Sequence, residues 1–162
     1  MSLVVGLAGR LESLSAARVL GAAAQRLINR GQPLWAPHEL NYEGLLESID
    51  AGELYFGKID DRAVGVFRLQ WEDPLFWPDV CPGESGFVHR LAIAPSHQGQ
   101  GLAHELLRFA ASLVAESGRP WLRLECEDRP KLRSVYESFG FRSVDVITVD
   151  DIVTCRYELS VS

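Results

Sequence analysis

The sequence predicts an α/β (α+β) fold in which a sheet of about seven strands is flanked by about four helices. Segments with the period of a helix alternate with β-rich runs along the whole chain. Two pairs of β-rich runs are separated only by short turns, which predicts antiparallel hairpins. The 162 residues are 47% hydrophobic, which is enough for one continuous core. Because no repeat or linker interrupts the pattern, we expect a single domain over residues 1–162.

The first half of the chain contains three of the predicted strands and two of the predicted helices. The strands are residues 3–8, 54–59 and 63–71, and the helices are residues 14–27 and 38–49. Gly31 is a plausible stop for the first helix, and Gly52 for the second. Asp60, Asp61 and Arg62 have the composition of a hairpin turn, so the two strands beside them should pair antiparallel.

The second half contains four predicted strands and two predicted helices. The strands are residues 87–94, 121–126, 141–149 and 152–159, and the helices are residues 102–116 and 130–139. Pro95 ends the first of these strands, and Gly140 ends the last helix. The final two strands are close enough in sequence to form a hairpin.

Residues 72–86 form a long predicted loop. The segment holds three prolines, two glycines, two aromatic residues and four acids, and it follows neither the helical nor the strand period. A loop of this length inside a compact domain is usually functional or disordered, and Phe76 and Trp77 argue against disorder. We expect the loop to cover a site, where Trp35, Phe76 and Trp77 are either an apolar wall for a ligand or ordinary core residues.

The cysteine and histidine patterns predict neither a disulfide framework nor a metal site. The cysteines are odd in number and lack CxxC spacing, and the histidines form no HExxH motif and no i,i+4 pair. These residues are Cys81, Cys126, Cys155, His38, His89, His97 and His104. We therefore predict no metal.

The charge and the hydropathy pattern exclude two classes of partner. The formal net charge is −6, which argues against a nucleic-acid-binding surface because phosphate contacts need clustered Lys and Arg. No apolar stretch approaches the roughly 20 residues that cross a bilayer, and residues 3–9 lack the basic start of a secretory signal. The sequence predicts a cytoplasmic protein without a membrane partner, whose ligand is small and neutral or cationic, and a homodimer is compatible with it.

The segment from Gln98 to Ala103 is the most informative in the chain, because it lies between a predicted strand and a predicted helix. Glycine allows close approach of a ligand to the backbone, and the first amides of a helix have no partner within the helix. Together they can bind a phosphate group. A Rossmann fingerprint would need glycine at position 104, and a P-loop would need Gly-Lys-Ser/Thr; neither is present.

These residues resemble the acetyl-CoA signature of the GCN5-related N-acetyltransferase (GNAT) family, Q/R-x-x-G-x-G/A, which Gln98, Gly101 and Ala103 fill. Residues 89–95 resemble the family's fourth strand, and residues 136–141 resemble its Y-E-x-x-G-F element. The three signals together span about residues 87–145. The resemblance implies the GNAT fold, with a mixed, mostly antiparallel and twisted sheet that is splayed between strands four and five.

The resemblance also implies where acetyl-CoA binds. The pyrophosphate would lie on the loop and first turn formed by Gln98, Gly99, Gln100, Gly101, Leu102 and Ala103. Pantetheine would pair with the backbone of Leu91, Ala92 and Ile93, in a strand that carries a bulge. The sequence departs from the family at Arg129, where many relatives have asparagine; arginine could contact a CoA phosphate instead.

The implied chemistry is the attack of an amine on the acetyl thioester. By matching position, Tyr136 would protonate the CoA sulfur or hydrogen-bond to it, and a backbone N–H near Ile93 would face the oxyanion. Strand alternation places His89 on the same strand face as Leu91 and Phe87, so His89 is our first candidate for the base. We expect its pKa to lie at about 6 to 7 if the environment shifts it little.

Other groups could also take the proton of the amine. Phe87 stands where some family members have a catalytic glutamate, so water could fill that role. The acids of the long loop are further candidates, either as bases or as ligands of a cationic substrate, and they are Glu72, Asp73, Asp79 and Glu84. His89 is alternatively a structural histidine, and Tyr136 is alternatively an aromatic packed on the inner helix face.

Three functions fit the sequence. The first is N-acetylation of a primary amine of a small molecule, such as an amino acid, a polyamine-like compound or an aminoglycoside-like compound, by direct attack in a ternary complex. The second is a non-catalytic acyl-CoA-binding regulatory domain, and the third is a protein or peptide N-acetyltransferase. Tyr136 favours catalysis over regulation. The long loop before Phe87 weighs against an open peptide groove.

Overall fold

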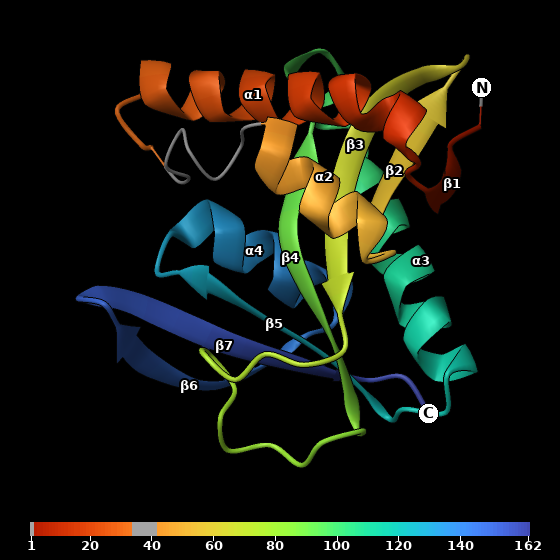
Figure 1. The fold of residues 1–162 in the computed structure, drawn as a ribbon. Coiled ribbons are helices and arrows are strands. Elements are labelled where there is room, and N and C mark those ends of the chain that lie inside the picture. The colour runs from red at the N-terminus through yellow and green to blue at the C-terminus, as the bar shows by residue number, and fades with distance from the viewer. Residues whose placement is uncertain (1, 34–41) are drawn as a thin grey trace. The chain divides into compact units, whose positions relative to one another are not determined.

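The structure is a computed structural model that describes residues 2–33 and 42–162 (Figure 1). Within these residues it contains seven strands, four α-helices and two short 3₁₀ helices. In chain order the elements are β1 (Val4–Leu7), η1 (Arg10–Glu12), α1 (Ser13–Asn29), α2 (Tyr42–Asp50), β2 (Leu54–Ile59), β3 (Arg62–Gln70), β4 (Ser85–Ile93), η3 (Pro95–His97), α3 (Leu102–Glu116), β5 (Trp121–Glu127), α4 (Pro130–Phe139), β6 (Arg142–Val149) and β7 (Ile152–Ser160).

The strands form a sheet in the order β1-β2-β3-β4-β5-β7-β6. The β1–β2, β2–β3, β5–β7 and β6–β7 pairs are antiparallel, whereas β4 and β5 are parallel. The registered parallel pairing joins residues 85–87 to residues 121–123. Strand β4 then continues to Ile93 and β5 to Glu127. The mixed, mostly antiparallel sheet is confirmed.

The chain divides into two compact units. The first comprises residues 1–68 and 90–106, and the second comprises residues 69–89 and 107–162. Strands β3 and β4 and helix α3 each contribute residues to both units. The single domain expected over residues 1–162 stays a prediction.

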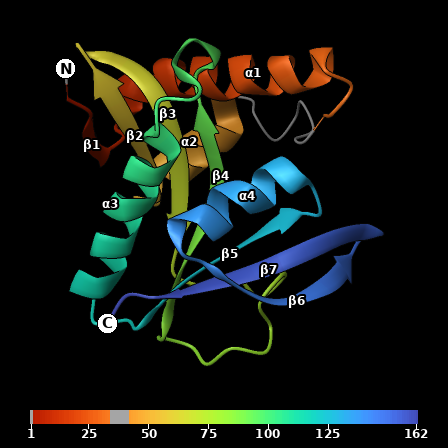
Figure 2. The same cartoon turned by 180° about the vertical axis from the view of Figure 1, so that it is seen from behind.

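The core of the first unit lies between two helices and the sheet. Helices α1 and α2 cover the face of β2 and β3 that is turned toward the viewer in Figure 1. The buried residues between them are Ala8, Ala16, Val19, Leu20, Ala23, Leu45, Ile49, Leu54, Phe56, Val66 and Ala92. Elsewhere in this unit Gly57 and Gly65 lie so close to Leu106 that an added Cβ would come within 3.2 Å and 2.8 Å of its methyl carbons. Glycine at these two positions allows the beginning of α3, on the near side of the strands in Figure 2, to pack directly on them.

Both hairpins turn on a pair of aspartates in the left-handed region. Asp60 and Asp61 have φ values of 50° and 62°, and Asp150 and Asp151 have 48° and 65°. Positive φ at both central residues is the type I′ geometry whose twist matches that of the flanking strands. Aspartate tolerates this conformation better than most residues with a Cβ. The two antiparallel hairpins predicted from the sequence are therefore confirmed.

The helix boundaries follow the predicted stop signals. Gly31, at φ 71°, donates its amide to the carbonyl of Ile28 just after α1, and Gly52, also at φ 71°, follows α2. Helices α3 and α4 have the predicted bounds. The predicted start of the second helix, residues 38–41, lies outside the described residues, as does Trp35. No helix in the described part of the chain is long and apolar enough to cross a membrane.

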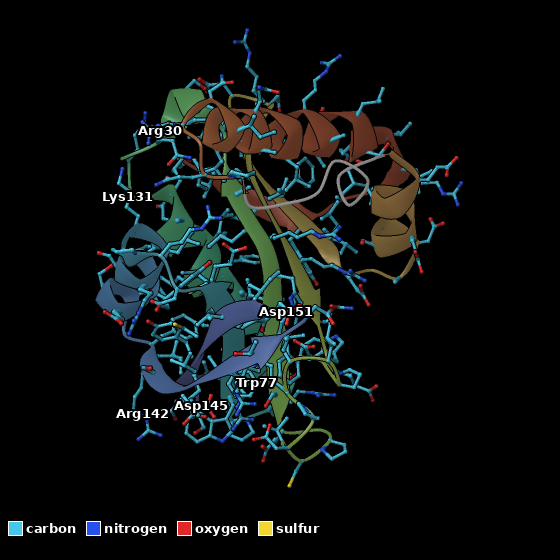
Figure 3. All side chains as sticks on the ribbon, turned by 90° about the vertical axis from the view of Figure 1, so that its left-hand side faces the viewer. Arg30, Trp77, Lys131, Arg142, Asp145 and Asp151 are labelled. Atoms are coloured by element: carbon cyan, nitrogen blue, oxygen red, sulfur yellow. The ribbon has the colours of Figure 1, made fainter. Side chains whose placement is uncertain are left out.

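Residues 71–84 of the second unit form the long loop between β3 and β4, and Trp77 anchors it. The Trp77 side chain, labelled in Figure 3, is only 3% exposed. Its ring lies under two guanidinium groups, with the Cζ of Arg156 at 4.5 Å and the Cζ of Arg123 at 5.4 Å from the centroid. Arg156 also pairs with Asp79 of the loop and with Asp145 of β6. The loop is therefore ordered by a buried aromatic residue and its charged neighbours.

Candidate functional site

The loop before α3 has the backbone geometry that a phosphate-binding turn requires. Gly99 and Gly101 have φ values of 77° and 76°, and no atom outside the adjacent residues lies within 4 Å of where their Cβ atoms would be. The first helical hydrogen bond of α3 joins the amide of Glu105 to the carbonyl of Gly101. The amides of Leu102 and Ala103 therefore have no partner within the helix. Free amides and an open backbone of this kind can bind a phosphate group.

Gln98 fixes this loop to the end of β4. Its side-chain Nε2 donates a hydrogen bond to the carbonyl oxygen of Ile93 at 2.8 Å. Because that carbonyl is engaged, the first signature residue holds the loop in place through its side chain. This role could not be predicted from the motif, which specifies only the residue type.

Strand β4 carries a backbone irregularity next to the predicted pantetheine-binding residues. Arg90 has φ of 52°, which is uncommon for a residue with a Cβ and interrupts the regular strand. It directly precedes Leu91, Ala92 and Ile93, and the last two are buried at 5% and 7% exposure. The side chains of Ala92 and Ile93 are packed inside the protein. This is compatible with the predicted role, in which only their main-chain groups would contact pantetheine.

His89 lies between two buried carboxylates in the second unit. Its Nδ1 is 2.9 Å from Oε1 of Glu125, and its Nε2 is 3.3 Å from Oδ2 of Asp73. The side chains of His89, Asp73 and Glu125 are 17%, 6% and 7% exposed. We call these three residues the His89 cluster. The sequence pointed to His89 and Asp73 as separate candidates, and the fold brings them together.

The two carboxylates change the protonation of His89. Burial by itself would lower the pKa of the imidazole, but the neighbouring carboxylates of Asp73 and Glu125 outweigh burial and raise the pKa from 6.5 to about 9. The expected range of about 6 to 7 is therefore wrong, because it assumed a weakly perturbing environment. At neutral pH His89 is mainly an imidazolium ion. It becomes a proton acceptor only as the pH approaches 9.

The acids of the long loop have different partners in the structure. Asp79 pairs with Arg156, which holds the pKa of that carboxyl below its usual range. Glu84 pairs with Arg123 at 2.9 Å. Of the four loop acids, Asp73 is the one that reaches His89.

Glu125 is a site residue that the sequence reasoning missed. It lies in the middle of β5, and its Oε2 accepts a hydrogen bond from the indole N–H of Trp77 at 3.2 Å. A signal was present, since Arg123, Glu125 and Glu127 alternate with apolar residues and so share one face of a central strand. Phe87, at the position of the missing family glutamate, is 2% exposed and lies with its ring centroid 6.2 Å from that of Trp77.

Tyr136 projects from α4 into an aromatic cluster. Its ring centroid lies 6.0 Å from that of Phe141 and 6.2 Å from that of Tyr157, and the residue is 9% exposed. Burial raises the pKa of Tyr136, with smaller contributions from Cys126 and Glu125. The phenol therefore keeps its proton throughout the physiological range, which a hydrogen-bond donor or general acid requires.

Arg129 is engaged by a neighbouring acid. It is the residue before the first turn of α4, and its Nε and one terminal nitrogen lie 2.8 Å and 2.6 Å from Oε2 of Glu127. If Arg129 contacts a phosphate of CoA, its guanidinium group has to interact with both that phosphate and the Glu127 carboxylate.

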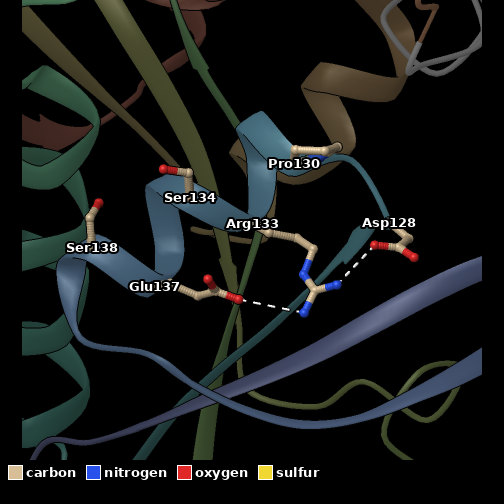
Figure 4. A pocket seen from close by; sticks show the side chains of 6 residues that line it. All are labelled: Asp128, Pro130, Arg133, Ser134, Glu137 and Ser138. Atoms are coloured by element: carbon tan, nitrogen blue, oxygen red, sulfur yellow. Dashed lines mark hydrogen bonds and ion pairs between the residues drawn. The ribbon is translucent and has the colours of Figure 1, made fainter.

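A separate pocket of about 400 Å³ opens along α4 (Figure 4). Its lining is formed by Asp128, Pro130, Arg133, Ser134, Glu137 and Ser138. Arg133 is held by Asp128 at 3.0 Å and by Glu137 at 3.6 Å, and it also donates to the hydroxyl of Tyr157. None of the predicted catalytic or cofactor-binding residues lines this pocket. Its single cation is already paired, so it has little to offer an anionic ligand.

Comparison with known families gives one clear match. Residues 34–159 match the model of the acetyltransferase (GNAT) domain. The uncharacterized N-acetyltransferase YesJ of Bacillus subtilis is 28% identical over 131 residues, which cover 76% of this chain and 72% of YesJ. Mycothiol acetyltransferase of Thermomonospora curvata is 29% identical over 120 residues, which cover 72% of this chain but 37% of that protein.

Solved structures show the same fold at low sequence identity. A GNAT-family acetyltransferase of Listeria monocytogenes has a TM-score of 0.78 and 19% identity, over 97% of this chain and 95% of that one. The protein yncA of Salmonella typhimurium, solved with its cofactor acetyl-CoA, has a TM-score of 0.77 and 12% identity, over 100% of this chain and 95% of that one. The chain therefore belongs to the GNAT family and is an acetyl-CoA-dependent N-acetyltransferase.

Proposed function

We propose that the enzyme transfers the acetyl group of acetyl-CoA to a primary amine of a small molecule, by direct attack in a ternary complex. One observation carries the choice of a small acceptor. The loop at residues 71–84 places Asp73 and Trp77 around the His89 cluster, so that the His89 side chain is only 17% exposed. An enclosed position of this kind favours a compact amine over a peptide chain.

The local geometry of the loop before α3 and the family signature support the proposed cofactor residues. The amides at the start of α3 and the open backbone at Gly99 and Gly101 would hold the pyrophosphate of acetyl-CoA, together with Gln100. The backbone of residues 91–93 would pair with pantetheine. Arg129 would add a cationic contact to a phosphate, in competition with Glu127.

The chemical step needs two proton transfers. The amine nitrogen forms a bond to the acetyl carbon while the carbon–sulfur bond breaks, so the amine must lose a proton and the thiolate must gain one. We assign the donor role to Tyr136, whose phenol stays protonated, and the acceptor role to His89 in its neutral form. Glu125 acts as a positioning residue, because it touches His89 and reaches the substrate only through it.

A panel of acceptors with acetyl-CoA, monitored by release of free thiol, tests this function. The panel should contain small alkylamines, amino acids, aminoglycoside-like amines and short peptides with free N-termini or lysines. We expect the highest kcat/KM with a small amine, and mass spectrometry should find a single acetyl group on it. Faster turnover of a peptide would instead make the enzyme a protein acetyltransferase. Acetyl-CoA binding without transfer to any amine of the panel would contradict the proposed small-amine acceptor.

A further inference from the structure

The His89 cluster contains more buried negative charge than the protein itself balances. The side chains of Asp73 and Glu125 are each more than nine-tenths buried, and among the described residues the imidazole between them is the one cationic group in contact with both. Even with His89 fully protonated, two carboxylates and one imidazolium leave a net charge of −1. Unbalanced buried charge is costly, so a site of this composition favours a cation.

The nearby arginines do not provide that charge, because other carboxylates hold them. Arg123 is paired with Glu84 and Glu158, and it donates a further bond to the hydroxyl of Ser85. Arg156 is paired with Asp79 and Asp145. Both guanidinium groups lie over the ring of Trp77.

The hydrogen bonds of the cluster leave one carboxylate oxygen open. Both oxygens of Glu125 are used, Oε1 by His89 and Oε2 by Trp77. Asp73 accepts the amide of Phe76 through Oδ1 at 3.1 Å. Its Oδ2 has no hydrogen-bond partner among the described residues, and neither has the Nε2 of His89, 3.3 Å away. This oxygen therefore has an ion-pair contact with the imidazolium but no hydrogen-bond donor, so it can still accept a hydrogen bond from a bound cation.

We propose that Oδ2 of Asp73 binds the ammonium group of the acceptor, and that the acceptor is an unhindered primary alkylamine that is cationic in water. An ammonium group supplies both the donor that this oxygen lacks and the positive charge that the cluster lacks. With it bound, the two carboxylates face two cations. This inference rests on the small-amine function proposed above, and it names the substrate class and the residue that selects it.

The same charges discriminate among amines. An α-amino acid carries a carboxylate next to its ammonium group. It would bring a second negative charge close to a cluster whose net charge is already negative. A neutral arylamine offers a donor but no charge. Of the acceptors that the sequence leaves open, simple alkylamines and polyamine-like compounds fit the cluster, and amino acids do not.

Equilibrium binding without acetyl-CoA tests the anchor separately from catalysis. The probes are n-butylammonium, aniline and norvaline, which carries the same alkylamine with an added carboxylate. The proteins are the wild type, Asp73→Asn and Asp151→Asn. Asp73→Asn keeps the size of the side chain and its bond to Phe76 but removes the charge. Asp151→Asn makes the same charge change in the exposed β6–β7 turn, at a φ of 65° that asparagine also tolerates.

Calorimetry and tryptophan fluorescence should show that butylammonium binds the wild type and the Asp151→Asn variant equally. We expect Asp73→Asn to weaken its binding by about tenfold or more. Aniline and norvaline should bind at least as weakly to the wild type as butylammonium binds to Asp73→Asn. Circular dichroism and acetyl-CoA affinity serve as folding controls. Equal binding of butylammonium to wild type and Asp73→Asn, or none to the wild type, overturns the anchor.

A cobalt titration separates this proposal from a metal site. The ligand atoms of Asp73, His89 and Glu125 lie within 4.8 Å of one another, a spacing that a divalent cation could also use. We expect Co²⁺ to produce no visible absorption band that depends on Asp73 and His89. A band that Asp73→Asn and His89→Gln both abolish would assign the missing charge to a metal and overturn the ammonium anchor. Acetylation of peptides alone would refute the small-amine function, while butylammonium binding still reports on Asp73.

Discussion

The indole N–H of Trp77 donates a hydrogen bond to Oε2 of Glu125, 3.2 Å away. The other oxygen of the same carboxylate holds His89. Trp77 comes from the loop at residues 71–84, so this one contact connects the loop to the residue that orients the proposed base. Loss of the indole N–H would leave a buried carboxylate oxygen without its donor, which is costly.

We expect Trp77→Phe to lower the free energy of unfolding by about 2 kcal/mol, because it removes this hydrogen bond and leaves a cavity under Arg156 and Arg123. Urea denaturation measures the change. Trp71→Phe is the matched control, since Trp71 is 37% exposed, and its effect should stay within about 0.5 kcal/mol. Equal effects of the two substitutions would mean that Trp77 does not anchor the loop.

The pH dependence of kcat/KM should report the raised pKa of His89. Below pH 9 the imidazole is protonated and cannot accept a proton, so the rate should rise with pH toward a limb at about 9. The amine also ionises, and acceptors of different pKa separate the two limbs because an enzyme group stays fixed. His89→Gln should remove the fixed limb, and Glu125→Gln should move it to lower pH. A fixed limb that survives in His89→Gln would make His89 structural.

The same group should make stability depend on pH. His89 has a pKa of about 9 in the folded protein and about 6.5 when unfolded, so its stabilising contribution is complete below about pH 6.5 and is lost as the pH rises through 9. The difference corresponds to about 3 kcal/mol at most. Urea denaturation of wild type and His89→Gln at pH 6 and pH 9.5 measures it. The difference in free energy of unfolding between wild type and His89→Gln should be smaller at pH 9.5 than at pH 6. A larger difference at pH 9.5 would mean that folding lowers the pKa of His89 instead of raising it.

Gly101→Glu should abolish acetyl-CoA binding. It places an anionic side chain in the proposed pyrophosphate loop, at a φ of 76° that disfavours any residue with a Cβ. Gly118→Glu is the matched control, because Gly118 has a φ of 81°, similarly open surroundings and a position beyond the other end of α3. Both variants should lose similar stability, whereas Gly101→Glu alone should lose affinity in calorimetry. Equal affinities would remove the loop from the cofactor site.

Tyr136→Phe should slow turnover by about 100-fold while acetyl-CoA binding stays nearly intact, because only the proton-donating hydroxyl is lost. Steady-state kinetics and calorimetry measure the two quantities. Tyr157→Phe removes a hydroxyl from the same aromatic cluster, one that serves Arg133 and Glu137, and its kcat should remain close to that of the wild type. If Tyr136→Phe also keeps the wild-type rate with chemistry rate-limiting, Tyr136 is a packing residue.

The helices, the hairpins and the turn of the proposed cofactor loop were predictable from the sequence because their causes are local. Gly31 and Gly140 end helices through their own backbone freedom, and the aspartate pairs at both hairpins set their turns without help from distant residues. The turn at Gly99 and Gly101 is local in the same sense. The acetyl-CoA signature could therefore be recognised as a string of neighbouring residues.

The His89 cluster was decided by the tertiary structure alone. Its three members come from the loop after β3, from β4 and from β5, and no spacing in the chain relates Asp73 to Glu125. The expected pKa of His89 failed for the same reason, since a pKa depends on which charges the fold places around the group and on how much water it excludes. The sequence by itself determined the fold and the residue types available for chemistry. Only folding decided which carboxylates would share the histidine, because charges act through space rather than along the chain.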